Sequence, residues 1–186
     1  MPGELPRKKF THYFSILDRD GDGMLERSDF ESIVGAVASA RGLQEGSAEY
    51  GRLRDAVMDT WSHIEEFADP NGDGRATLDE WIQTLDDTIN NEDKYERYVT
   101  PFATGVFEML DTDNDDEVGP DEYRQFFSIF GASTDASDEA FRRLDTNGDG
   151  RLTKSELLER VREFHTADDP NAPGNYLFGS FEGAGT

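Results

Sequence analysis

One spacing of acidic and amide residues recurs four times along this chain of 186 residues and constrains its fold more than any other feature. The repeats span residues 18–29, 69–80, 111–122 and 145–156. Each begins Asp-x-Asp/Asn-x-Asp and ends on an acidic residue at its twelfth position. A hard divalent cation takes about six to eight oxygen ligands, and a loop of this length supplies them from side chains and one backbone carbonyl. The spacing therefore predicts four loops that bind a cation such as calcium.

The charge of the chain is concentrated in these repeats. The whole chain has 41 acidic and 18 basic residues, a formal net charge of −23 and a pI of about 4.3. The repeats hold 19 of the acidic and 5 of the basic residues, a net charge of −14. A chain this acidic repels phosphate backbones, so we expect no nucleic-acid partner.

Other classes of protein are excluded by what the sequence lacks. There is no cysteine, and therefore no disulfide framework and no thiolate metal site. No apolar run is long enough to span a membrane, and no signal peptide is visible, so we expect a cytoplasmic location. Three histidines and no nucleophile or phosphate-loop motif indicate that the chain is not an enzyme. We expect a monomer.

Apolar residues recur at helical spacing on both sides of every repeat. Before the first repeat, for example, they are Phe10, Tyr13, Phe14 and Leu17. Each loop therefore lies between two amphipathic helices, and the fold class is all-α. The eighth position of each repeat is apolar, which suits a short two-strand pairing between neighbouring loops; these residues are Leu25, Ala76, Val118 and Leu152.

Four helix-loop-helix units with such loops resemble the EF-hand proteins, and the resemblance covers residues 10–165. The loops begin 51, 42 and 34 residues apart. An enlarged first gap resembles the sarcoplasmic calcium-binding proteins and their bacterial relative calerythrin, as does the sequence PGNYLFGSF at residues 173–181. The resemblance implies four EF-hands in two packed pairs and up to four bound Ca²⁺ ions.

This organisation divides the chain into three parts. We expect an N-terminal EF-hand pair over residues 1–91, a C-terminal pair over 92–166, and a tail over 167–186 that packs on the body. Thr100 and Pro101 indicate either a helix start or a kink in a longer connecting helix. Arg7, Lys8 and Lys9 are expected to form a solvated N-terminal turn.

The loop pattern assigns a ligand role to positions 1, 3, 5, 9 and 12, and to the backbone carbonyl at position 7. Loop one offers Asp18, Asp20, Asp22, Met24, Glu26 and Asp29, and loop two offers Asp69, Asn71, Asp73, Arg75, Thr77 and Glu80. Loop three offers Asp111, Asp113, Asp115, Glu117 and Glu122, and loop four offers Asp145, Asn147, Asp149, Arg151, Thr153 and Glu156.

Two loops depart from the pattern. Loop one ends on Asp29 instead of Glu, and the shorter side chain favours lower coordination, so Mg²⁺ is expected to compete chiefly there. Loop three has Asp116 where the others have glycine, and Gly119 leaves its ninth position without a side-chain ligand. Loop three is therefore the weakest of the four calcium assignments.

The sequence leaves two roles open. Calcium sensors expose a groove that is often rich in methionine, whereas this chain has 4 Met and 13 Phe. This composition favours an intracellular calcium buffer or store with a compact closed fold. The alternative is a sensor that exposes a hydrophobic groove to a protein target on binding calcium.

Overall fold

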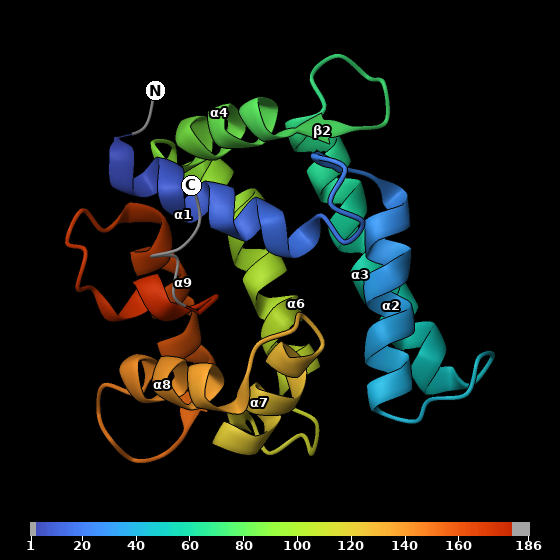
Figure 1. The fold of residues 1–186 in the computed structure, drawn as a ribbon, viewed down its shortest axis with the longest axis vertical. Helices are drawn as coiled ribbons and strands as arrows, with labels where there is room; N and C mark the ends of the chain where they lie inside the picture. The colour runs from blue at the N-terminus through green and yellow to red at the C-terminus, as the bar shows by residue number, and fades with distance from the viewer. Residues whose placement is uncertain (1–2, 180–186) are drawn as a thin grey trace.

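The computed structural model describes residues 3–179 and shows an all-α protein (Figure 1). The first half contains α1 (Glu4–Leu17), α2 (Arg27–Ala40), α3 (Ala48–Ala68) and α4 (Leu78–Ile89). The second half contains α5 (Glu92–Lys94), η1 (Tyr95–Val99), α6 (Thr100–Leu110), α7 (Pro120–Ser128), α8 (Thr134–Leu144), α9 (Lys154–Thr166) and the 3₁₀ turn η2 (Pro173–Tyr176).

Four two-residue strands join the loops in pairs. Strand β1 (Met24–Leu25) pairs antiparallel with β2 (Ala76–Thr77), and β3 (Glu117–Val118) pairs with β4 (Leu152–Thr153). Leu25 lies opposite Ala76 and Val118 lies opposite Leu152, and all four are fully buried. The predicted all-α fold of two helix-loop-helix pairs with short strand pairings is confirmed.

One continuous helix connects the two halves, because α5, η1 and α6 follow one another without a break. Pro101 has no N–H group, so the helix cannot keep its regular hydrogen bonds there. Tyr95–Val99 instead form a wider π-helical turn, in which the Thr100 N–H bonds to the carbonyl of Tyr95. Of the two alternatives at Thr100 and Pro101, the structure has the longer connecting helix.

The two halves share one core. Helix α1 lies across the molecule between α4 and α9 (Figure 1), and Tyr13 lies at this junction. The Tyr13 ring contacts Trp81 of α4 at a centroid distance of 5.2 Å and Phe164 of α9 at 6.1 Å. Among residues 3–179, no helix is both long and apolar enough to cross a membrane.

The segment after α9 lies against the body. Gly174 packs so closely on α9 that a Cβ there would lie 2.4 Å from the Arg160 carbonyl oxygen, which explains the glycine. The Tyr123 hydroxyl donates to the Leu177 carbonyl at 3.0 Å, and the Phe178 ring stacks on Tyr13 at 4.2 Å. Residues 180–186, which include the end of the predicted tail, lie outside the described residues.

The predicted N-terminal turn is part of helix α1, on which Arg7 and Lys8 are exposed as expected. The prediction of a solvated side chain is wrong for Lys9. Lys9 is 0 % exposed, and its Nζ donates to the Ala167 carbonyl at 3.0 Å and to Asn175 Oδ1 at 3.1 Å. Burial lowers the pKa of Lys9 to about 8. The sequence around Lys9 contains no sign of these acceptors, because they come from residues more than 150 positions away.

Candidate metal-binding loops

In every loop, the first Asp accepts backbone N–H groups of its own loop. The Asp18 carboxylate accepts from Gly21 at 2.8 Å and from Gly23 at 2.9 Å. Asp145 accepts from Gly148 and Gly150 at the same two distances, and Asp69 accepts from Gly72 and Gly74. In loop three the donors to Asp111 are the N–H groups of Asp115 and Asp116. These hydrogen bonds therefore hold each loop in a curved conformation around its position 1 carboxylate.

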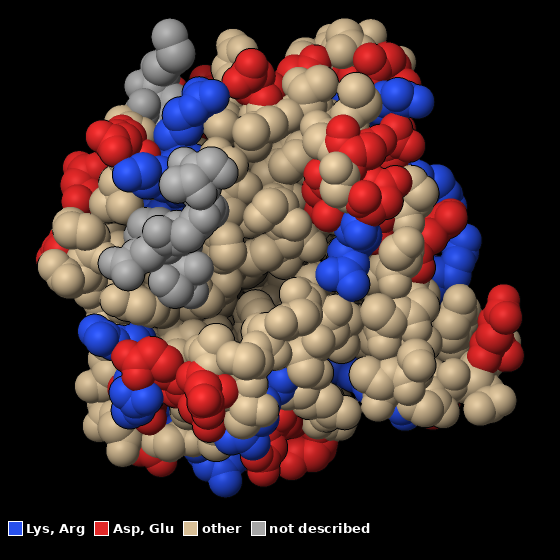
Figure 2. Space-filling model, in the orientation of Figure 1, with Lys and Arg blue, Asp and Glu red and all other residues tan. Residues whose placement is uncertain are grey.

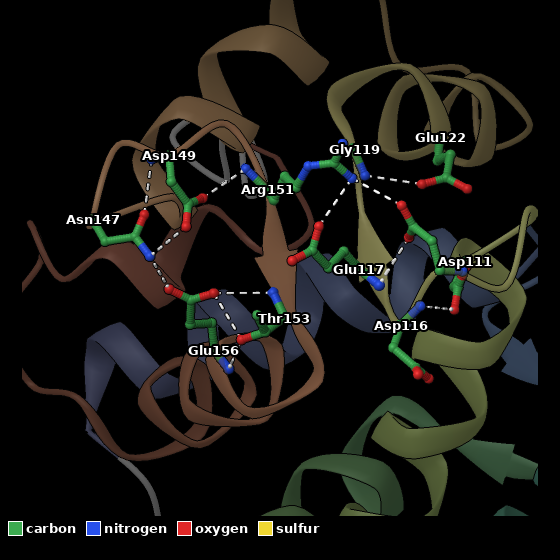
Figure 3. Close-up of polar contacts among 11 residues, drawn as sticks. Asp111, Asp116, Glu117, Gly119, Glu122, Asn147, Asp149, Arg151, Thr153 and Glu156 are labelled. Atoms are coloured by element: carbon green, nitrogen blue, oxygen red, sulfur yellow. Dashed lines mark hydrogen bonds and ion pairs between the residues drawn. The ribbon is translucent and has the colours of Figure 1, made fainter.

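The acidic residue at position 12 belongs both to the loop and to the first turn of the next helix. Its carboxylate accepts the backbone N–H of position 9, at 2.9 Å for both Glu80 and Glu156. In loops two and four its second oxygen also accepts the side-chain amide at position 3. The Asn147 amide, for example, lies 2.6 Å from Glu156 Oε1 (Figure 3). The helix start therefore positions the last ligand opposite the first ones.

Ligand oxygens of different positions gather in loops one and three. Carboxylate oxygens of Asp18, Asp20 and Asp22 lie within 4.8 Å of one another. In loop three the same holds for Asp111, Asp113 and Glu122, so there the twelfth position joins the group.

Hydrogen bonds within the loops lower the pKa of three predicted ligand carboxyls. The backbone N–H and hydroxyl of Thr77 hold the pKa of Glu80 below its ordinary value. Desolvation raises the pKa of Asp69 and of Glu122. Backbone N–H donors outweigh this effect, and the pKa of each carboxyl is lowered. All three carboxylates are thus negatively charged and available to a cation at neutral pH.

The other predicted ligands lie where the pattern requires. Met24 and Glu117, at position 7, lie on β1 and β3, while Arg75 and Arg151 directly precede β2 and β4. Position 9 directly precedes the following helix, and there the hydroxyls of Thr77 and Thr153 cap α4 and α9. Coordination by these residues stays a prediction.

Sequence reasoning missed a second role for two of these residues. Arg75 and Arg151 were assigned only as carbonyl ligands, but their guanidinium groups reach across to the partner loop. Arg75 Nε lies 3.0 Å from Glu26 Oε1. Arg151 Nη1 lies 2.9 Å from both Asp115 Oδ2 and Glu117 Oε2. The available signal was the same basic residue at position 7 of both even-numbered loops.

The donor set fits calcium. The predicted ligand atoms are carboxylate, amide, hydroxyl and carbonyl oxygens, without thiolate or imidazole. Hard cations such as Ca²⁺ and Mg²⁺ prefer oxygen ligands, whereas zinc favours nitrogen and sulfur. The gathered carboxylates line loops one and three with oxygen atoms that can hold such an ion.

Comparisons with known proteins agree with this chemistry. The family model described as "EF hand" matches residues 11–34 and 138–161. Calerythrin of Saccharopolyspora erythraea is 33 % identical over 161 residues, which cover 86 % of this chain and 89 % of that protein. The sarcoplasmic calcium-binding protein beta chain of Penaeus sp. is 31 % identical over 172 residues, covering 88 % and 90 %.

A solved structure has the same fold. The sarcoplasmic calcium-binding protein from amphioxus superimposes with a TM-score of 0.79 over 97 % of this chain and 99 % of that chain, at 18 % sequence identity. The likeness extends through both helix-loop-helix pairs.

Proposed function

Because this chain belongs to the EF-hand family that contains calerythrin and the sarcoplasmic calcium-binding proteins, it is a calcium-binding protein, and we propose that it acts as a calcium buffer or store. The proposed ligands are the side chains at positions 1, 3, 5, 9 and 12 of each loop, Gly119 excepted, and the carbonyl at position 7. When bound, calcium supplies the positive charge that these acidic loops lack.

The packing of the segment that follows α9 is the main support for the buffer role. Leu177 is buried in the second pair, where Tyr123 of α7 bonds to its carbonyl, and Phe178 stacks on Tyr13 of α1. A sensor must open an apolar groove for its target. In this protein such an opening would break contacts that join both pairs to the segment, so calcium binding is expected to occur in a closed molecule.

One feature favours a sensor instead. An apolar cavity of about 50 Å³ lies between the pairs, and its lining includes Phe102, Val106, Met109 and Phe130, which are only partly buried. On the face of the molecule shown in Figure 2, uncharged residues cover the centre, which is hollowed, and acidic residues lie towards the edges. An apolar side chain of a target helix could enter such a hollow if calcium widened it.

Binding of a hydrophobic dye with and without calcium distinguishes the two roles. A buffer predicts that dye fluorescence stays level or falls when calcium is added to the chelated protein. Phe178→Ala provides a positive control, since removal of its stacking ring is expected to raise dye binding in the calcium form. A large calcium-induced increase that an amphipathic helical peptide suppresses would instead assign the sensor role.

The tail as a separate unit, the monomeric state and the cytoplasmic location stay predictions. Competition by magnesium, chiefly at loop one, also stays a prediction.

A further inference from the structure

The side chain of Arg151 joins two calcium loops. Its backbone stands at position 7 of loop four, while its guanidinium lies over loop three (Figure 3). There Nη1 is 2.9 Å from Asp115 Oδ2 and 2.9 Å from Glu117 Oε2. Asp115 is the predicted fifth-position ligand of loop three. The guanidinium cation of Arg151 thus contacts a carboxylate that is also a proposed calcium ligand.

Loop three is where such a cation matters most. Residues 111–122 contain seven acidic residues and no basic one, the highest negative charge of the four loops. The guanidinium of Arg151 is the cation that two of these acidic side chains contact, Asp115 through a hydrogen bond and Glu117 through an ion pair.

The first pair repeats the arrangement in a weaker form. Arg75, at position 7 of loop two, reaches Glu26 at position 9 of loop one. The antiparallel pairing sets Leu25 against Ala76 and Val118 against Leu152, so a side chain from position 7 projects over the partner loop. Arg75 contacts a ninth-position residue, whereas Arg151 contacts the fifth-position ligand.

We propose that Arg151 is a counter-cation built into the protein that lowers the calcium affinity of loop three and stabilises this loop when calcium is absent. The inference rests on the proposed calcium binding. Two positive charges within a few ångströms repel each other, and a carboxylate bonded to a guanidinium offers less negative charge to an ion. Both effects oppose calcium at Asp115, whether Arg151 stays in contact or moves away.

The side chains involved are about half exposed, with 50 % of Arg151 and 42 % of Asp115 accessible. Pairs this exposed contribute little to stability, because solvent screens them. The expected effect is accordingly modest: Arg151→Met tightens calcium binding at loop three about 2- to 5-fold. It also lowers the melting temperature of the metal-free protein, because loop three loses its counter-charge.

Site-resolved NMR titration of the full-length protein measures this effect. Each loop has an amide that donates to its position 1 carboxylate, and these amides belong to Gly23, Gly74, Asp116 and Gly150. Their ¹H–¹⁵N signals report calcium at each loop separately. A competing chelator of known affinity converts the four titrations into dissociation constants.

Arg142→Met is the matched control. Arg142 lies on α8 in the same half, pairs with Glu139 of its own helix, and its loss changes the net charge equally. It should alter the loop-three affinity less than 2-fold, because salt screens interactions between exposed charges beyond a Debye length of ~8–10 Å. Arg151→Lys keeps the charge without the guanidinium fork and should give an intermediate affinity.

The outcomes are distinct. Tighter binding at the Asp116 signal in Arg151→Met, together with an unchanged Arg142→Met, supports the counter-cation. An unchanged or weaker loop three, while the other loops still titrate, overturns the inference and identifies Arg151 as a residue that only positions Asp115. A wild-type protein in which none of the four signals responds to calcium contradicts the proposed function itself.

Discussion

At the scale of single residues, the backbone of loop three is the most strained of the four. Positions 4 and 6 have positive φ in every loop, and in loops one, two and four both are glycine. In loop three they are Asn114, at φ 60°, and Asp116, at φ 65°. Asn and Asp tolerate this region better than other residues, yet still at a cost relative to glycine. Figure 3 shows the Asp116 carboxylate pointing away from Asp111, so the strain is not offset by a ligand.

The substitution Asp116→Gly should therefore tighten calcium binding at loop three. Relief of about 1 kcal/mol of strain corresponds to a gain of up to ~5-fold in affinity. Isothermal titration of the wild type and the variant measures it, with Asp135→Gly on the exposed surface of α8 as a control for the loss of one charge. Weaker calcium binding in Asp116→Gly would show that the negative charge matters more than the backbone.

At the scale of elements, each calcium loop ends as a helix begins, and the length of one side chain decides how the two fit. Both oxygens of Asp29 accept backbone N–H groups, from Arg19 at 2.9 Å and from Glu26 at 2.8 Å. Glu80, which is one methylene longer, also reaches across its loop to the Asn71 amide at 2.8 Å. Asp29 holds the start of α2 but extends less far over loop one.

We expect loop one to discriminate poorly against magnesium and Asp29→Glu to correct this. A longer side chain can offer both oxygens to calcium, which takes more ligands than magnesium does. Calcium titrations followed at the Gly23 amide, in millimolar magnesium and without it, test the change, with loop two as the internal reference. Equal magnesium sensitivity of the wild type and the Asp29→Glu variant would contradict this account of selectivity.

At the scale of the whole molecule, acidic loops and a shared core act against each other. The loops carry −14 of the net charge of −23, and four calcium ions would add about +8. The helices between them bury their apolar faces in one core that runs from α1 to Leu177. Without a cation, repulsion between the loop carboxylates pushes the loops apart. Because each loop connects two helices, this repulsion also weakens the packing of those helices.

Removal of calcium should thus destabilise the entire fold. Each site at 100-fold excess of calcium over its dissociation constant adds about 2.7 kcal/mol to the free energy of unfolding. For a chain of this length, filling two or more sites should raise the melting temperature by ~10 °C or more. Circular dichroism with excess chelator and with calcium measures melting and helix content. Identical curves would mean that the acidity is only a solvated surface.

The sequence by itself determined the local features of this protein. The twelve-residue spacing specified the loops, and helical periodicity specified their flanks, because both depend on residues a few positions apart. The buried pairing at position 8 and the pairing of loops also followed from this pattern. The connecting helix at Pro101 stayed open between two alternatives, since a proline can either begin a helix or be accommodated by a wider turn.

Only the tertiary structure decided the long-range contacts. The burial of Lys9 depends on acceptors in the segment after α9, and the stacking of Phe178 on Tyr13 joins opposite ends of the chain. Arg151 and Asp115 are 36 positions apart in sequence and meet because β3 pairs with β4. Local patterns contain no information on which distant groups a side chain will meet. These contacts form only when α1, α9 and the loops pack against one another and bury their apolar surface.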